Sequence, residues 1–175
     1  MKKIVVTGPE STGKSTLSQQ LAAHYNTLWC PEYAREYLGN NGNVYTYDDL
    51  LTIAKGQAAL EDLYIQRARE AGHSFLFIDT DMYVMKTWCE FVYGKCHRYI
   101  LEQAATRQYD LYLLCDTDLA WTPDILREYP DLESRRTLYK IYRDILVNQP
   151  VPWFNINGNH NQRLELSIAA VNKIL

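Results

Sequence analysis

The sequence predicts an α/β protein with a doubly wound, five-stranded parallel sheet. Short apolar runs alternate along the chain with longer stretches of helical periodicity, as in successive βαβ units. Polar or glycine-rich residues follow the expected strands, and ligands of such folds gather at the carboxyl ends of strands. The length of 175 residues suits one domain with a single core, so residues 1–175 are expected to form one domain.

The amino-terminal half is expected to contain three strands and two helices. Residues 4–6 are a short β-branched run before a glycine turn, which is typical of a strand. Residues 75–78 are continuously apolar, as expected of a strand buried on both faces. Leucines and alanines recur at helical spacing before it, and Gly72 supplies a natural stop. The predicted elements are strands at 3–7, 26–30 and 74–79 and helices at 14–25 and 47–72.

The carboxy-terminal half continues the alternation. Residues 111–114 form another continuous apolar run and indicate a buried strand. The last segment is amphipathic, and the segment before the final strand is strongly charged on one side. The predicted elements are helices at 82–93, 98–107, 132–147 and 162–175 and strands at 110–115 and 151–156.

Residues 8–15 match the phosphate-loop pattern G-x-x-x-x-G-K-[ST] between an expected strand and an expected helix. Glycines allow backbone angles that turn successive N–H groups inward around phosphate oxygens, and the helix adds its positive dipole end. Lys14 is expected to reach the β- and γ-phosphates of ATP, and Ser15 to ligate Mg²⁺. The expected ATP-binding residues are Gly8, Glu10, Ser11, Thr12, Gly13, Lys14, Ser15 and Thr16.

The phosphate loop alone does not name the reaction, because kinases, ATPases and GTPase switches share it. A GTPase would carry a guanine-reading Asn-Lys-x-Asp motif after a late strand. This chain has Asn157-Gly158-Asn159-His160 there. The sequence therefore disfavours a GTPase switch.

Two carboxylates follow the apolar run at 75–78. Asp79 ends the expected strand, where such a fold delivers a carboxylate to Mg²⁺, so Ser15 and Asp79 are the expected metal ligands. Asp81 is expected either to contact substrate hydroxyls and assist proton removal, or merely to cap the helix that starts at Met82.

Acidic, basic and aromatic residues follow the second expected strand. Glu32 is expected to accept the proton of an attacking hydroxyl, and Tyr33 and Arg35 offer planes that stack on a flat ring. The same residues also suit the first turn of a solvated helix, since the helix dipole favours acids there. By position, the aromatic candidates for a ring pocket are Tyr33, Tyr37, Trp88 and Trp121.

Arginines follow the fourth expected strand, one before the helix at 132–147 and two near its start. On a mobile cover, such a residue would neutralise charge on the transferring phosphoryl group. A charged exposed face is the alternative interpretation. The sequence does not decide among Arg127, Arg135 and Arg136.

Composition narrows the partners and the compartment. The net charge is −3 and the basic residues are dispersed, which weighs against nucleic acid and anionic membranes. No apolar run approaches the ~20 residues of a membrane span, and the start is too short for a signal-peptide core, so a cytoplasmic protein is expected. Cys89, Cys96 and His97 are close in sequence but lack an evident fourth zinc ligand, and reduced thiols are expected.

Four segments in this order resemble the ribosylnicotinamide kinase domain of NadR-type NAD-salvage proteins. They are Gly-Pro-Glu-Ser-Thr-Gly-Lys-Ser-Thr at 8–16, Glu-Tyr-Ala-Arg-Glu-Tyr at 32–37, Phe-Ile-Asp-Thr-Asp at 77–81 and Trp-x-x-Asp-x-x-Arg at 121–127. Gly56-Gln57 and Tyr93-Gly94 with His97 agree with them, and the resemblance spans nearly the whole chain.

The resemblance implies a P-loop kinase fold with a helical lid at about 118–136. It also implies ATP-dependent phosphorylation of nicotinamide riboside at its 5′-hydroxyl to nicotinamide mononucleotide. Carried over, the catalytic residues are Lys14, Glu32, Asp79, Asp81 and Arg127, and the substrate-binding residues are Glu32, Tyr33, Arg35 and Asp81.

Bifunctional members of that family carry an adenylyltransferase domain ahead of the kinase. Met1 here opens directly into the first expected strand, so a stand-alone kinase is expected. A kinase for another nucleoside or nucleotide and a regulatory ATP-binding module remain alternatives. The sequence leaves homo-oligomerisation open.

Overall fold

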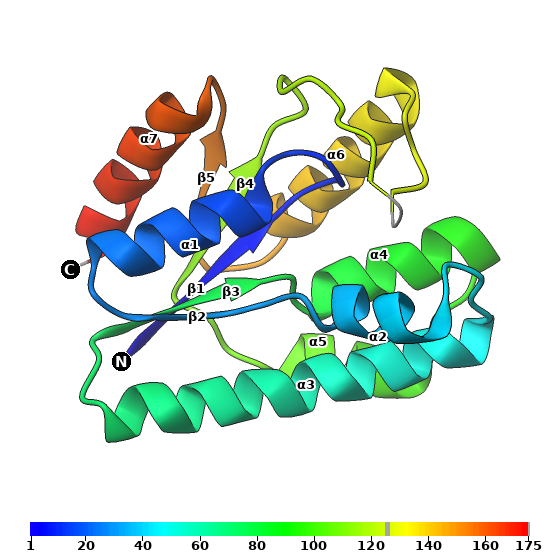
Figure 1. Cartoon of the computed structure of the whole chain (residues 1–175), viewed down its shortest axis with the longest axis horizontal. Helices are drawn as coiled ribbons and strands as arrows, with labels where there is room; N and C mark the ends of the chain where they lie inside the picture. Colours follow the sequence, from blue (N-terminus) through cyan, green and yellow to red (C-terminus); the bar gives the residue numbers. More distant parts are fainter. Residues whose placement is uncertain (125–126, 175) are drawn as a thin grey trace.

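The computed structural model describes residues 1–124 and 127–174. Within these residues the chain forms five strands and seven helices (Figure 1). In chain order they are β1 (Lys2–Thr7), α1 (Lys14–His24), β2 (Leu28–Cys30), α2 (Tyr33–Asn41), α3 (Tyr47–Glu70), β3 (Phe75–Asp79), α4 (Met82–Tyr93), α5 (Arg98–Thr106), β4 (Leu111–Cys115), α6 (Leu132–Val147), β5 (Trp153–Ile156) and α7 (His160–Asn172).

The strands form one parallel sheet in the order β2-β3-β1-β4-β5. The predicted doubly wound five-stranded sheet is therefore confirmed. β1 lies at the centre, and its register pairs Val6 with Asp79 at the end of β3. This pairing places the carboxylate that ends β3 beside the glycine-rich loop that follows β1.

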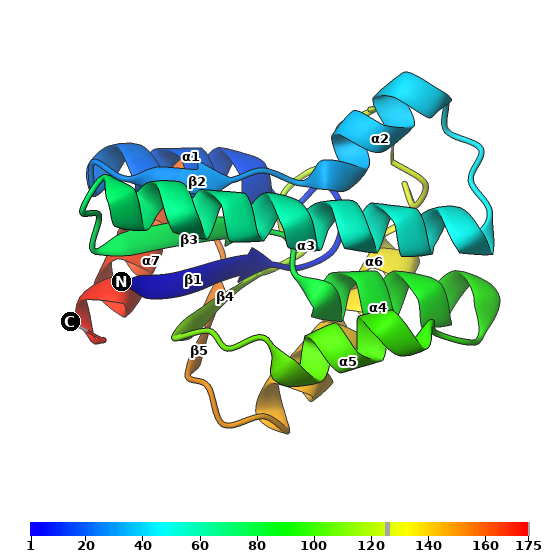
Figure 2. The ribbon, with the colours of Figure 1, turned by 90° about the horizontal axis from the view of Figure 1, so that it is seen from below.

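Helices cover both faces of the sheet (Figures 1 and 2). Side chains of a strand alternate between faces, so Ile4 and Val6 point to one side and Val5 to the other. Val6 packs in one apolar cluster with Leu17 of α1 and Val171 of α7. Val5 packs in a second cluster with Ala68 of α3 and side chains of α6.

A helical layer continues past the ends of β2 and β3 (Figure 2). The amino-terminal half of α3 packs there with α2, α4 and α5, through a third apolar cluster that includes Leu38, Ile53, Met85 and Ile100. This layer forms one side of the space above the phosphate loop.

Several boundaries differ from the predictions for local reasons. The second strand starts at Leu28, because Asn26 adopts a left-handed φ of 48° that ends extended structure. α7 starts at His160, because Asn159 and Gln162 form a capping box. Leu175, the predicted helix end, lies outside the described residues.

The segment 118–136, hereafter the lid segment, is not helical as predicted over most of its length. In its described part, helix begins at Leu132. Pro123 and Pro130 lack the N–H that a helix interior needs, which accounts for the irregular backbone. Residues 125–126 of the lid segment lie outside the description.

Among the residues that the structure covers, no helix combines the length and the apolar character needed to span a membrane.

Candidate active site

The phosphate loop has the backbone geometry that its glycines predict. Gly8 has a φ of 137°, and a Cβ at this position would lie 2.7 Å from the carbonyl oxygen of Cys115. Gly13 is the left-handed N-cap of α1, with a φ of 78°. Thr12 Oγ1 donates to the carbonyl oxygen of Pro9 at 2.7 Å, which ties the loop together. Lys14 Nζ donates to the same oxygen at 2.8 Å, so the ammonium folds across its own loop.

Ser15 and Asp79 lie together, as predicted for the metal ligands. Ser15 Oγ donates to Asp79 Oδ2 at 2.5 Å. Asp79 is buried, and its Oδ1 has no hydrogen-bond partner among the described residues. Burial, followed by the charge of Glu32, raises the pKa of Asp79 to about 6. A hydroxyl and an incompletely bonded carboxylate are hard oxygen donors, so these two residues fit Mg²⁺.

A cavity opens above the phosphate loop between α2, α4, α6 and the lid segment. Its floor includes all eight expected ATP-binding residues. Its walls come from side chains far apart in sequence: Glu32, Ala34, Arg35, Leu38, Val84, Trp88, Phe91, Arg127, Glu128, Tyr129, Leu138 and Tyr142. The fold therefore places the phosphate loop and a wall of aromatic and charged side chains around the same cavity.

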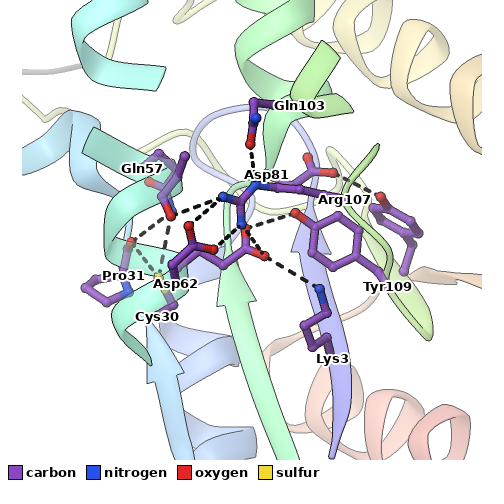
Figure 3. Close-up of polar contacts among 12 residues, drawn as sticks. Lys3, Cys30, Pro31, Gln57, Asp62, Asp81, Gln103, Arg107 and Tyr109 are labelled. Atoms are coloured by element: carbon purple, nitrogen blue, oxygen red, sulfur yellow. Dashed lines mark hydrogen bonds and ion pairs between the residues drawn. The ribbon is translucent and has the colours of Figure 1, made fainter. Parts of the chain in front are cut away.

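Asp81, expected to be a catalytic and substrate-binding group or a helix cap, does not line this cavity. Its Oδ1 accepts from the backbone N–H of Val84 at 3.3 Å as the N-cap of α4, and its Oδ2 accepts from Tyr112 Oη at 3.1 Å. Burial raises the pKa of Asp81 to about 7. Figure 3 shows Asp81 with its carboxylate directed at this tyrosine hydroxyl, beside Arg107 and Tyr109. The capping alternative describes its placement.

The residues after β2 divide between the cavity and the interior. Glu32 is the N-cap residue of α2 and lines the cavity together with Arg35. Tyr33 does not line it, because its ring lies against Gly56 of α3, where a Cβ would come within 2.0 Å of Tyr33 Cε1. Its backbone N–H donates to Gln57 Oε1 at 2.7 Å. In the described structure Tyr33, an expected substrate-binding residue, therefore docks α2 against α3.

Of the four aromatic candidates, Trp88 lines the cavity in the described structure. Tyr37 lies outside the lining, because its hydroxyl donates to Asp49 Oδ1 at 2.6 Å and faces the start of α3. Trp121 also lies outside the lining, with its indole N–H 3.5 Å from Glu10 Oε1.

The lid segment is docked onto the phosphate loop through Glu10. Glu10 Oε1 accepts from the backbone N–H of Tyr129 at 2.6 Å, and Oε2 accepts from that of Glu128 at 2.9 Å. Ser11 Oγ accepts from the backbone N–H of Thr122 at 3.0 Å. Since backbone N–H groups of the lid segment are the donors, these hydrogen bonds fix the position of its main chain relative to the phosphate loop.

Among the three lid arginines, Arg127 lines the cavity. Its guanidinium donates to the carbonyl oxygen of Thr122 and lies 4.0 Å from Asp124. Arg135 is buried and donates to the carbonyl oxygen of Leu119 at 3.4 Å, and Arg136 is exposed. The geometry therefore favours Arg127 as the lid arginine nearest to a bound ligand.

Residues 3–163 match the protein family described as "AAA domain". This chain belongs to the AAA domain family. It is also 27% identical over 160 residues to the "Trifunctional NAD biosynthesis/regulator protein NadR" of Salmonella typhimurium and of Escherichia coli strain K12. The match covers 89% of this chain and 38% of each relative, so the chain spans well under half of their length.

Solved structures agree on the fold of this AAA domain. A NadR protein in complex with NR superimposes with a TM-score of 0.80 and 22% identity, over 99% of this chain and 49% of that one. A NadR protein with NAD and AMP-PNP gives 0.70 and 23%, over the same shares of each chain. Thymidylate kinase from Ehrlichia chaffeensis gives 0.69 and 15%, over 97% of this chain and 98% of that one. The predicted P-loop kinase fold and the resemblance to NadR-type proteins are confirmed.

Sequence reasoning missed part of the cavity wall of this AAA domain. Phe91 and Tyr129 contact edge to face, with ring centroids 5.4 Å apart, and Glu128 lies next to them in the lining. Trp88 Nε1 donates to Tyr45 Oη at 2.8 Å, which fixes the indole from behind. These residues come from α4 and the lid segment and carry no short motif, so the chain pattern gives no signal for their meeting.

The cysteine and histidine group contains no metal site in the described structure. No set of three or more His, Cys, Asp or Glu side chains there is arranged to hold a metal ion. Cys89 is buried, and His97 stacks on the ring of Tyr47 at 3.7 Å between centroids. His97 Nε2 also lies 2.9 Å from the carbonyl oxygen of Tyr47, so this group anchors the start of α3.

Proposed function

We propose that this chain phosphorylates nicotinamide riboside at its 5′-hydroxyl, with ATP as donor and Mg²⁺ as cofactor. The P-loop kinase fold and the NadR relatives support a kinase-type phosphotransferase. The observation that carries the proposal is the shared cavity, in which the phosphate loop faces a wall that is both aromatic and acidic.

On the donor side, the loop amides and the amino-terminal end of α1 bind the phosphates of ATP. Lys14 leaves the Pro9 carbonyl and reaches the β- and γ-phosphates, since an anionic oxygen is the stronger acceptor. Ser15 and Asp79 hold Mg²⁺, which when bound neutralises charge on the phosphate oxygens. Arg127 adds positive charge from the lid segment.

On the acceptor side, Glu32 is the carboxylate that accepts the proton of the 5′-hydroxyl. It lines the cavity and lies close enough to Asp79 to raise the pKa of that group, so it faces the metal region. Arg35 lies one helical turn from Glu32 and is held by Asp124 of the lid segment, with 2.9 Å between Nη1 and Oδ2. Both side chains therefore act where the acceptor sugar meets the donor phosphate.

The ring of nicotinamide riboside is flat and carries a positive charge. Aromatic faces attract such a cation, and a carboxylate nearby strengthens the attraction. Trp88, Phe91 and Tyr129 supply the faces, and Glu128 supplies the carboxylate. This wall favours the charged pyridinium over an uncharged base of similar size.

The experiment is an ADP-release assay with product masses, across nicotinamide riboside, common ribonucleosides, deoxynucleosides and their monophosphates. We expect the highest kcat/KM for nicotinamide riboside. Its reduced dihydro form is the matched control, because it keeps the size and loses the ring charge. Equal rates for both forms would remove the basis for the charged acceptor, and preference for a monophosphate would point to a nucleotide kinase, with Arg35 as phosphate ligand.

A further inference from the structure

Arg163 is a fully buried arginine in the first turn of α7, outside the lining of the cavity. It is 1% exposed and belongs to the largest buried side chains described. Positive charge near a helix amino terminus is unfavourable, and burial of a guanidinium costs several kcal/mol unless its N–H groups are bonded. Its position therefore depends on specific partners.

The partners of Arg163 come from three loops at one end of the sheet. Nε donates to the carbonyl oxygen of Gly158 at 2.8 Å, and Nη2 donates to that of Asp116 at 3.1 Å. Nη2 also bonds the carboxylate of Asp118. Nη1 donates to the carbonyl oxygen of Thr12, inside the phosphate loop, at 3.1 Å. The loops after β1, β4 and β5 lie side by side at that end (Figure 1).

The bond to Thr12 bears directly on phosphate binding. A trans peptide group is planar, and its C=O and N–H point in opposite directions. When Arg163 holds the carbonyl of Thr12, the N–H of Gly13 must point away from Arg163, and it is Gly13 and not Arg163 that lines the cavity. Gly13 is the left-handed N-cap of α1 and has no side-chain cap of its own, so other contacts must fix this peptide plane.

We infer that Arg163 is a positioning residue that orients the Gly13 N–H toward the donor phosphates. The inference rests on the proposed ATP-dependent function, because it assigns how the nucleotide cradle is kept in shape. Preorganised N–H donors bind an anion without the cost of ordering the backbone on binding. Loss of the Arg163 contact lets the Thr12–Gly13 peptide rotate.

Asp118 supports the same arrangement. Its carboxylate bonds Arg163, and its Oδ2 accepts from the backbone N–H of Gly158 at 2.6 Å. The side chain of Asp118 is 40% exposed, whereas that of Arg163 is 2% exposed. Asp118→Asn therefore weakens the hold on Arg163 at a position where the fold tolerates change.

The test compares Arg163→Lys, Asp118→Asn and Arg98→Lys with the wild-type protein. Arg98 is the matched control, because it is 91% exposed and pairs with Glu102 on its own helix. Isothermal titration with a non-hydrolysable ATP analogue and Mg²⁺ gives Kd, and thermal unfolding gives Tm. Nuclear magnetic resonance of ¹⁵N-glycine-labelled protein reports the Gly13 amide directly.

We expect Arg163→Lys to raise the Kd of the analogue by about tenfold or more, since a charged hydrogen bond is lost. We expect Asp118→Asn to raise it by a smaller factor and Arg98→Lys to leave it unchanged. In Arg163→Lys and Asp118→Asn the Gly13 amide signal should shift in the nucleotide-free protein at temperatures well below Tm. Acceptor KM, measured at saturating ATP, should stay at the wild-type value.

A lower Tm with an unchanged Kd and an unmoved Gly13 signal would show a merely structural role and overturn the inference. If Arg163→Lys does not fold, an unaltered Kd and Gly13 signal in Asp118→Asn would overturn it equally. Wild-type protein that bound no nucleotide would instead remove the proposed function itself. The two failures are therefore distinguishable.

Discussion

Two groups of carboxylates, one around Glu61 and one around Asp79, differ in whether ion pairs within the protein neutralise them. The Glu61 cluster consists of Lys3, Glu61, Asp62, Arg107 and Tyr109 (Figure 3). Arg107 Nη1 lies 3.0 Å from Glu61 Oε1, and Tyr109 Oη donates to Glu61 Oε2 at 2.9 Å. The guanidinium also donates to both oxygens of Asp62.

Asp79, in the second group, has no ion pair among the described residues. Asp79 bonds Ser15 through one oxygen and has no hydrogen-bond partner for the other within the described chain. Asp79 and Asp81 are two residues apart, yet one faces the phosphate loop and the other joins the interior. The difference teaches that charge paired by the protein itself holds elements together, whereas charge left unpaired is available for a ligand.

Glu61→Gln is expected to have the largest effect on stability. The substitution leaves the partly buried cations of Lys3 and Arg107 without their shared carboxylate, which costs up to about 3–5 kcal/mol. Urea unfolding measures the loss, and turnover of the remaining folded protein should be unchanged. If Glu61→Gln lost turnover without losing stability, the Glu61 cluster would not have the purely structural role that distinguishes it from Asp79.

Lys14→Ala is expected to show the opposite pattern. Removal of one preorganised positive group at the transferring phosphate lowers kcat by about 10²–10³-fold. The ammonium is partly exposed and bonds its own loop, so Tm should stay near the wild-type value. A coupled ADP assay measures kcat, and an unaltered kcat would refute the assigned donor site.

Glu32→Gln should reduce kcat by about 10²-fold, as expected when the residue that acts as general base can no longer accept a proton. The Kd for ATP should change little, because Glu32 belongs to the cavity wall and not to the phosphate loop. Titration with an ATP analogue checks this. An effect confined to the acceptor KM would make Glu32 a binding group and reopen the identity of the base.

Asp81→Asn should change stability in a pH-dependent way, by on the order of a few kcal/mol near neutral pH. The pKa of Asp81 is raised to about 7 in the folded protein from an ordinary value of 3.8. Between these values the folded state keeps a proton that the unfolded chain releases, so rising pH favours unfolding. Asn does not titrate and still caps α4, so the variant should gain stability relative to wild type as pH rises toward 7.

Urea titrations from pH 4 to 8 measure this difference, with turnover as the parallel readout. Asp79, whose pKa is about 6, is present in both proteins, so the free energy of unfolding should still fall with rising pH below about pH 6 in each of them. If Asp81→Asn lost turnover while its stability curve stayed parallel to wild type, Asp81 would belong with Asp79 at the site.

Local patterns predicted what depends on local physics. Apolar runs locate every strand, and glycine spacing locates the phosphate loop, because both follow from backbone and burial rules that act over a few residues. The direction of Asp79 also follows, since a strand end fixes it. The placement of Asp81 depends on Tyr112 of another strand, which no short pattern encodes.

The cavity wall and the conformation of the lid segment could not be predicted from the sequence for the same reason. Phe91 and Tyr129 meet only after α4 and the lid segment pack, and Arg163 acts through carbonyl groups of three loops. The prediction of a helical lid followed family resemblance and not the prolines at 123 and 130, which point to irregular backbone.

The absence of a side chain at position 56 shapes the acceptor wall from behind. The ring of Tyr33 fills the notch that Gly56 leaves in α3, and Glu32 immediately precedes Tyr33 at the start of α2. Any larger residue at 56 would push that ring outward and carry Glu32 with it. A glycine that does not line the cavity therefore controls where the Glu32 carboxylate sits in the cavity wall.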